Sequence, residues 1–152
     1  MTIPTDPTFK LDPRLEQDCL TITDLPLSRI LLMDDARYPW LILVPRCANI
    51  TEIFELSEAQ QQQLMAESSA LSKAMTTHFQ PRKMNVANLG NIVSQLHLHF
   101  IARFEDDPAW PGAVWGHSPA IPYSEPALVE RHNTLNSILV EVQRQLGKAG
   151  NS

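Results

Sequence analysis

Gln95-Leu96-His97-Leu98-His99-Phe100-Ile101-Ala102-Arg103 is the stretch whose pattern says most about this chain. Polar and apolar residues alternate along its first half, which predicts a β-strand with two different faces. The polar members Gln95, His97 and His99 share one face. The apolar members between them point to the opposite face and into a core: Leu96, Leu98 and Phe100. Because a neutral imidazole offers one donor and one lone pair, this polar row can hold an anion and attack it.

Two histidines at positions i and i+2 allow three interpretations. They can be hydrogen-bonded structural residues, half of a zinc site, or an anion-binding catalytic site. Zinc wants three or four ligands, and the other candidates are scattered without CxxC or HExxH spacing: Cys19, Cys47, His78, His117 and His132. We therefore favour the catalytic interpretation and expect no metal ligands. The preceding loop, Asn88-Leu89-Gly90-Asn91, supports it, because glycine lets backbone come close to a ligand.

Length and composition indicate one globular domain over residues 1–152. Hydrophobic residues make up 43% of the chain and charged residues 19%, as in ordinary soluble domains. The net charge of −5 argues against a nucleic-acid-binding surface, which needs a basic patch. No apolar run approaches the length of a membrane span, and the first residues lack the pattern of an export signal. We therefore expect a cytoplasmic protein whose two cysteines are free thiols, with no membrane partner.

Local patterns predict an α+β fold. Apolar and alternating runs predict strands over 19–23, 28–33, 40–44 and 83–87, in addition to the histidine strand. Asp12 before Pro13 predicts a short helix over 13–19, and Ser57 with Gln60 forms a capping box for a long helix ending near residue 78. We expect a twisted antiparallel sheet with that long helix packed on one face and a C-terminal helix over 125–147. Residues 1–12 are expected to form a loosely held arm, and residues 104–124 a Trp- and Pro-rich loop.

The residues from Gly90 to Ile101 resemble the signature of the histidine triad (HIT) superfamily, Gly-Gln-Ser/Thr-x-x-His-φ-His-φ-His-φ-φ, in which φ is apolar. The stretch from Arg29 to Arg46 resembles the two strands that precede the main helix in that family. Gln95 occupies the first triad position, as in a bacterial subfamily with the pattern Gln-x-His-x-His. The resemblance implies the same α+β fold and a homodimer formed across the helix and a sheet edge.

The resemblance also implies roles for individual residues. His97 would be the nucleophile, with one ring nitrogen held as N–H by the backbone carbonyl of Gln95, and His99 would stabilise the charge on a phosphate. Backbone N–H groups around Gly90 and Asn91, with Asn88 beside them, would bind the same phosphate. Asp34 lies where family members hold the ribose hydroxyls. The alternative is that this Asp only stabilises a turn.

Three residues depart from the family pattern. Gln95 replaces the first histidine, which is tolerable if the position acts through its carbonyl. Ile92 stands where the family often has a hydroxyl that helps to protonate the leaving group, and this favours weakly basic leaving groups. Trp40 aligns with a histidine of some members. Trp110 and Trp115 either stack on a base or pack against the last helix, and we favour packing.

The resemblance implies a nucleotide-binding hydrolase or nucleotidyl transferase that cleaves at the α-phosphate through a covalent nucleotidyl-histidine. The substrate would be a small nucleotide derivative, either a dinucleoside polyphosphate or a nucleoside phosphoramidate. No cofactor would be required, although Mg²⁺ can arrive with the substrate. The alternative is a catalytically weak nucleotide-binding or regulatory module of the same fold, and a metal-dependent hydrolase built on His97 and His99 is a third hypothesis.

Overall fold

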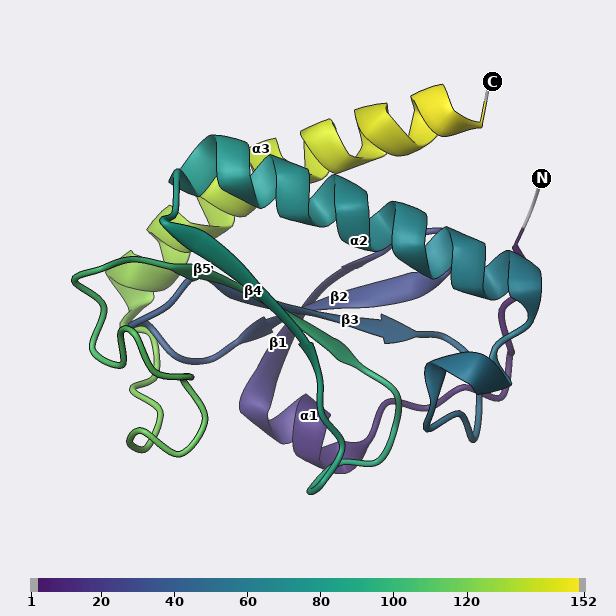
Figure 1. Cartoon of the computed structure of the whole chain (residues 1–152), viewed down its shortest axis with the longest axis horizontal. Helices are drawn as coiled ribbons and strands as arrows, with labels where there is room; N and C mark the ends of the chain where they lie inside the picture. Colours follow the sequence, from purple (N-terminus) through teal and green to yellow (C-terminus); the bar gives the residue numbers. More distant parts are fainter. Residues whose placement is uncertain (1–2, 151–152) are drawn as a thin grey trace.

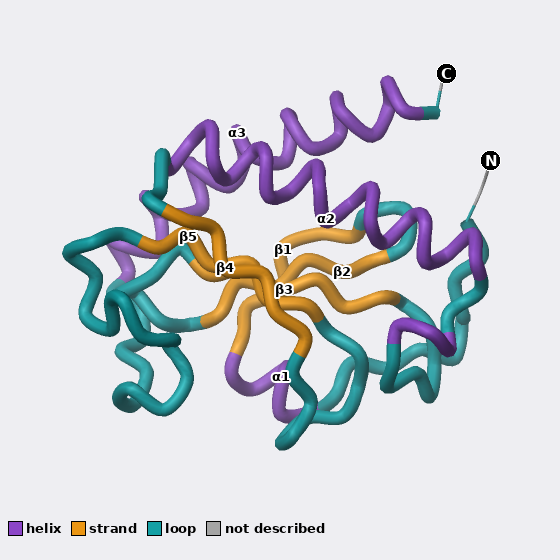
Figure 2. Tube along the Cα trace, viewed as in Figure 1, coloured by secondary structure: helices purple, strands orange, loops and turns teal. Residues whose placement is uncertain are grey.

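Five strands form one antiparallel sheet in a computed structural model that describes residues 3–150 (Figures 1 and 2). The strands lie in the order β1-β2-β3-β5-β4. Their bounds are Cys19–Asp24 for β1, Ser28–Met33 for β2, Trp40–Pro45 for β3, Lys83–Asn88 for β4 and Leu98–Arg103 for β5. The sheet, the long helix and the C-terminal helix confirm the predicted α+β fold.

The histidine strand begins later than its alternation predicts. β5 starts at Leu98, so Gln95 and His97 precede it. Leu98 is paired on both sides, with Leu43 of β3 and Asn88 of β4. Leu98 is the first residue of β5 that pairs with either neighbouring strand, so the residues before it are not paired in the sheet. The alternation of side chains nevertheless continues through them, and Leu96, Leu98 and Phe100 lie in the core as expected.

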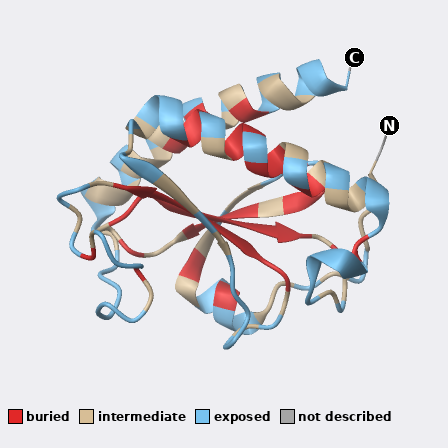
Figure 3. Cartoon of the chain, in the orientation of Figure 1, coloured by how far each residue is buried: buried red, intermediate tan, exposed pale blue. Residues whose placement is uncertain are grey.

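The sheet separates two hydrophobic cores. One lies under the helices α2, Glu58–Phe79, and α3, Glu125–Ala149, which cover the same face of the sheet (Figure 1). The other lies on the opposite face beside the short helix α1, Pro13–Asp18, and contains Trp40, Ile42 and Ile101. All residues of β3 and β5 are buried in consequence, as the red central strands of Figure 3 show. The two histidines belong to the second face.

Local capping explains where the helices begin. The Ser57 side chain accepts a hydrogen bond from the Gln60 backbone N–H, and the Gln60 side chain accepts one from the Ser57 backbone N–H. This reciprocal capping box confirms the prediction. The Asp12 side chain accepts from the Arg14 N–H at the start of α1, with Pro13 in the first turn, also as predicted. A short 3₁₀ helix, η1 (Ile53–Glu55), precedes α2.

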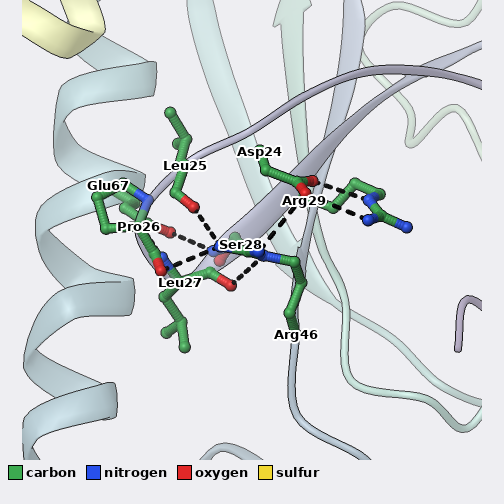
Figure 4. Close-up of polar contacts among 8 residues, drawn as sticks. All are labelled: Asp24, Leu25, Pro26, Leu27, Ser28, Arg29, Arg46 and Glu67. Atoms are coloured by element: carbon green, nitrogen blue, oxygen red, sulfur yellow. Dashed lines mark hydrogen bonds and ion pairs between the residues drawn. The ribbon is translucent and has the colours of Figure 1, made fainter. Parts of the chain in front are cut away.

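A buried carboxylate from α2 holds the turn between β1 and β2. Glu67 is fully buried, and its two oxygens accept hydrogen bonds from the backbone N–H groups of Leu27, at 2.7 Å, and Ser28, at 3.1 Å (Figure 4). Burial raises the pKa of Glu67, although these hydrogen bonds act in the opposite direction. The long helix is thereby bound to the sheet by polar contacts as well as by apolar packing.

The first residues are tied to the domain more closely than a loosely held arm would be. In the described part, residues 3–12, the Asp6 N–H donates to the Arg46 carbonyl at 2.9 Å. Phe9 and Leu11 pack against the core of the second face. The Gln95 side chain also bridges to Lys10 and Asp12. The segment therefore follows a defined path across the sheet.

The Trp- and Pro-rich loop is anchored by a buried ion pair. Arg103, at the end of β5, binds both carboxylate oxygens of Asp107 at 2.7 and 3.0 Å and donates to the Gly112 carbonyl at 2.8 Å. Asp107 also accepts from three backbone N–H groups of the loop, those of Phe104, Ala109 and Trp110. Farther along, Ala36 N–H donates to the Ile121 carbonyl.

Within residues 3–150, none of the helices is long and apolar enough to cross a membrane.

Candidate active site

A cavity of about 320 Å³ opens on the second face of the sheet, where both histidines lie. Its walls come from α1, the end of β2, the loop between β4 and β5, the start of β5 and the loop after β5. The volume falls in the range of small-molecule sites. The lining residues are Arg14, Leu15, Asp18, Met33, Leu89, Gly90, Asn91, Ile92, Val93, His97, His99 and Trp115.

His97 is held through one ring nitrogen. Its Nδ1 lies 2.7 Å from the backbone carbonyl oxygen of Gln95, the contact that the resemblance implies. Because a carbonyl only accepts, Nδ1 must carry the hydrogen, and the lone pair is then on Nε2. Only 5% of the residue surface is exposed. The ring therefore presents a nucleophilic nitrogen from a fixed position.

His99 makes the opposite kind of contact. The indole Nε1 of Trp40 lies 3.0 Å from His99 Nδ1. The centroid of the His99 ring lies 4.9 Å from the centroid of the His97 ring and 5.0 Å from that of the Trp115 ring. Burial, with the neighbouring His97, lowers the pKa of His99 to about 3. The imidazole of His99 is neutral at physiological pH.

Gln95 contributes its backbone to the site and its side chain to the fold. The Oε1 atom accepts from the Asp12 N–H at 2.9 Å, and the Nε2 group donates to the Lys10 carbonyl at 2.8 Å. The amide thus binds the N-terminal segment. The carbonyl is the part of Gln95 that reaches the histidines.

The glycine loop borders two hollows, and Leu89, Gly90 and Asn91 line both. Gly90 and Asn91 line the histidine cavity, whereas Asn88 does not. Asn88 lines a neighbouring hollow together with Thr51, Glu52 and Ser94. A methyl group added at Gly90 would meet only the Val93 carbonyl oxygen, at 3.7 Å, so packing within the protein does not demand glycine there. Ile92 lines the cavity while 81% of it is exposed.

Asp34 lies in a second hollow that adjoins the histidine cavity. This hollow, of about 470 Å³, shares Arg14, Asp18, Met33 and Trp115 with the first. One carboxylate oxygen of Asp34 accepts from the Tyr123 N–H at 2.9 Å. The adjacent carboxylate, Asp35, is buried and forms an ion pair with Arg37 at 2.8 Å, which is a structural role.

The sequence did not identify several residues of the site. Arg14 and Asp18, which form an ion pair at 2.9 Å on α1, line both hollows. Their i and i+4 spacing on a predicted helix was visible in the sequence, but no local pattern placed that helix beside the histidines. Trp115 was expected to pack against the last helix and instead lies against His99 and Trp40. Trp110 lies over the Arg103 guanidinium, outside both hollows.

Three apolar residues of β2 and β3, namely Leu32, Leu43 and Val44, line neither hollow. Leu32 and Leu43 are fully buried in the core under α2 and α3, and Val44 is buried in the core of the other face. The apolar lining of the cavity comes instead from other residues: Leu15, Met33, Leu89, Ile92 and Val93. Among residues 3–150, no three side chains of His, Cys, Asp or Glu gather in the manner of a metal site.

Comparisons with known proteins give this geometry a context. The chain is similar to the crystal structure of a histidine triad protein from Marinobacter aquaeolei VT8, with 48% identity and a TM-score of 0.85 over 88% of this chain and 98% of that one. A histidine triad protein from Bradyrhizobium japonicum shares 43% identity and a TM-score of 0.84, covering 90% of this chain and 99% of the other.

A more distant structure shows the fold alone. It is that of a hypothetical histidine triad nucleotide-binding protein from Sulfolobus tokodaii, with 13% identity and a TM-score of 0.60 over 86% of this chain and 88% of that one. No curated protein matches the chain. Residues 14–106, which include the sheet and both histidines, match the HIT domain family. The chain belongs to the HIT domain family.

Proposed function

We propose that this protein is a nucleotide hydrolase or nucleotidyl transferase that acts through a covalent nucleotidyl-His97. The observation that carries the proposal is the 2.7 Å contact between His97 Nδ1 and the Gln95 carbonyl, because it leaves the Nε2 lone pair for attack. His97 and the glycine loop line the same cavity of about 320 Å³, in which a phosphate group can be bound.

The reaction has two steps. The Nε2 lone pair of His97 forms a bond to the α-phosphorus, while the bond from phosphorus to the leaving group breaks and the leaving group keeps its electron pair. Water then attacks the same phosphorus, the N–P bond breaks, and the lone pair returns to His97 as the mononucleotide forms and a proton enters solvent. An alcohol or a second phosphate in place of water makes the same reaction a transfer.

Hydrogen-bond donors around the cavity suit the charge that develops on the phosphate. His99 lines the cavity beside His97, and Gly90 and Asn91 line the same cavity. Donors fixed before the reaction stabilise an oxyanion strongly because they need no reorganisation. No resident metal is needed for this chemistry, and Mg²⁺ would enter only with a polyphosphate substrate.

The adjoining hollow suits the nucleoside part of the substrate. One Asp34 oxygen is occupied by the Tyr123 N–H, so the carboxylate is oriented and retains further lone pairs for the ribose hydroxyls. The apolar wall formed by Leu15 and Met33 offers a surface for a base.

The test is turnover of a substrate panel by wild type, His97→Ala and a matched control, His78→Ala. The panel contains a dinucleoside polyphosphate, an adenosine phosphoramidate and a nucleotide sugar, with products separated by chromatography. His78 lies exposed on α2, so its loss should change nothing. Wild type and His78→Ala should release a mononucleotide, and His97→Ala should bind the nucleotide without turnover.

Mass spectrometry of acid-free quenched reactions should detect a nucleotidyl adduct on His97 only. Equal rates for wild type and His97→Ala would overturn the mechanism. The second candidate function, a nucleotide-binding module, is favoured by the absence of a hydroxyl at Ile92, which leaves that wall of the cavity apolar. Mononucleotide binding by calorimetry, with no product from any member of the panel, would establish that alternative.

A further inference from the structure

Trp40 and His99 form a buried donor–acceptor pair across two neighbouring strands. Trp40 opens β3, where its partner in β5 is Ile101, and His99 is paired with Ile42, so the two rings are diagonal neighbours on one face of the sheet. Trp40 is 6% exposed and His99 4%. Their nitrogens are 3.0 Å apart, a hydrogen-bond distance.

The chemistry of indole fixes which atom carries the hydrogen. An indole nitrogen only donates, so Nδ1 of His99 must accept and cannot itself be protonated in the neutral ring. The hydrogen of His99 therefore lies on Nε2. Within residues 3–150 no protein group is hydrogen-bonded to that Nε2, and His99 lines the cavity. The two neighbouring imidazoles thus adopt opposite tautomers, since His97 holds its hydrogen on Nδ1.

We propose that Trp40 is a positioning residue, which fixes the ring and the tautomer of His99 so that its Nε2–H is a permanent hydrogen-bond donor to the substrate phosphate. The catalytic part of this inference rests on the proposed function above. Trp40 is one of the positions at which the sequence departs from the family pattern, and its indole supplies the donor here.

A fixed neutral donor also defines a class of substrate. A neutral imidazole is a very weak acid, so His99 gives the phosphate a hydrogen bond but does not surrender a proton. Ile92 has no proton to give either. A leaving group in this cavity must therefore depart without protonation by these two residues, which favours weakly basic phosphates over amines. We infer that phosphoanhydrides are cleaved faster than alkyl phosphoramidates.

The first experiment is independent of activity. In protein labelled with ¹⁵N, NMR should detect a scalar coupling between Trp40 Nε1 and His99 Nδ1, transmitted through the hydrogen bond. The ¹⁵N shifts of His99 should show a hydrogen on Nε2, and those of His97 a hydrogen on Nδ1. A hydrogen on Nδ1 of His99 would overturn the proposal.

The second experiment compares the kinetics of Trp40→Phe with those of Trp110→Phe. Phenylalanine at position 40 keeps an aromatic ring but removes the N–H, and Trp110 lies outside both hollows. Without the Trp40 donor the tautomer of His99 is no longer fixed, so the bond from its Nε2–H to the phosphate weakens in the transition state. A loss of about 1–1.5 kcal/mol should lower kcat of Trp40→Phe about tenfold, with little change in KM. Trp110→Phe should behave as wild type.

The outcomes separate the two proposals. An active wild type with an unchanged kcat in Trp40→Phe, or with no coupling, would overturn the positioning role and leave the function intact. An inactive wild type with the coupling present would overturn the function, while the pair and the tautomer stand. Thermal unfolding of Trp40→Phe shows whether a loss of kcat reflects a loss of folding.

Discussion

His97 and His99 carry the same side chain, and their neighbours make them chemically different. A carbonyl faces Nδ1 of His97, and an indole N–H faces Nδ1 of His99. The first contact leaves a lone pair for attack, and the second leaves a donor. Residue type alone therefore does not assign the roles, because the assignment depends on one backbone atom and one side chain beside each ring.

Burial of a neutral His99 should make stability depend on pH. Its pKa is lowered to about 3, whereas an unfolded histidine titrates near 6.5. The unfolded state thus binds a proton that the folded state does not, and the free energy of unfolding should fall as pH drops from 6.5 toward 3, by up to about 1.4 kcal/mol per pH unit. Above pH 6.5 the effect is absent.

Urea unfolding of wild type and His99→Gln at pH 7, 5.5 and 4.5 measures this contribution. Titratable groups that the two proteins share and that lie away from His99 cancel in the difference between the two proteins. Wild type should lose more stability on acidification than the variant. Parallel curves would show that His99 is readily protonated in the folded protein.

Gln95 allows its two roles to be separated by one substitution. Gln95→Met removes the hydrogen bonds to Lys10 and Asp12, so the free energy of unfolding should fall by about 1–2 kcal/mol. The carbonyl that holds His97 is backbone and persists, so kcat should stay within about threefold of wild type. Unfolding curves and steady-state rates measure the two quantities. A large fall in kcat without a loss of stability would assign the amide a part in the chemistry.

At the scale of elements, the loop after β5 is organised by the Arg103–Asp107 pair. Both side chains are buried, and Asp107 binds three loop N–H groups as well as the guanidinium. Removal of one partner leaves a buried charge unpaired, so Asp107→Ala should lower the free energy of unfolding by about 3–5 kcal/mol. The same loop carries Trp115, and substrate binding should weaken in parallel.

Glu105→Ala is the matched control for Asp107→Ala. Glu105 belongs to the same loop, but its ion pair with Arg82 is 68% exposed on both sides. Exposed pairs contribute little, so this variant should lose less than about 1 kcal/mol. Chemical unfolding measures both variants. Similar losses for the two would show that the loop does not depend on its buried anchor.

Local signals made most of the elements predictable. The capping box at Ser57, the Asp12–Pro13 start and the alternating strands each depend on residues close together in the sequence, and each was confirmed. The start of β5 was predicted too early because strand length is set by the neighbouring strands, which no local pattern reveals. The Gly90 and His97 parts of the cavity followed from one short motif.

The rest of the site depends on contacts between distant segments. Trp115 reaches His99 only because Arg103 and Asp107 fold the intervening loop back over the sheet. Arg14 and Asp18 reach the cavity because α1 crosses below it. The pairing of Trp40 with His99 spans two strands and requires the register of β3 on β5. None of these is encoded in the spacing of neighbouring residues.

At the scale of the whole molecule, β4 is an edge strand with an exposed apolar residue. It ends the sheet, so among residues 3–150 one side of its backbone has no strand partner, and Val86 on it is half exposed. Such edges attract a second strand. The family resemblance implies a homodimer across the helix and a sheet edge, and we propose that β4 is that edge.

The prediction is tested by Val86→Lys in sedimentation equilibrium. In a two-fold symmetric dimer the substitution brings two lysines close together, and their repulsion should weaken dimerisation about tenfold or more. Val140→Lys is the matched control, because Val140 is also an exposed valine but lies on α3. A monomeric wild type, or equal dissociation constants for the two variants, would overturn the edge-to-edge dimer.

The two cores described above have a consequence for protein engineering. The helices α2 and α3 and the anchoring carboxylate Glu67 lie on one face of the sheet, while the histidines, Trp40 and the cavity lie on the other. Libraries that vary residues packed under the helices can therefore raise heat tolerance without altering the lining of the histidine cavity. Libraries confined to the cavity lining can change which ligands the protein binds, while the core under the helices stays as it is.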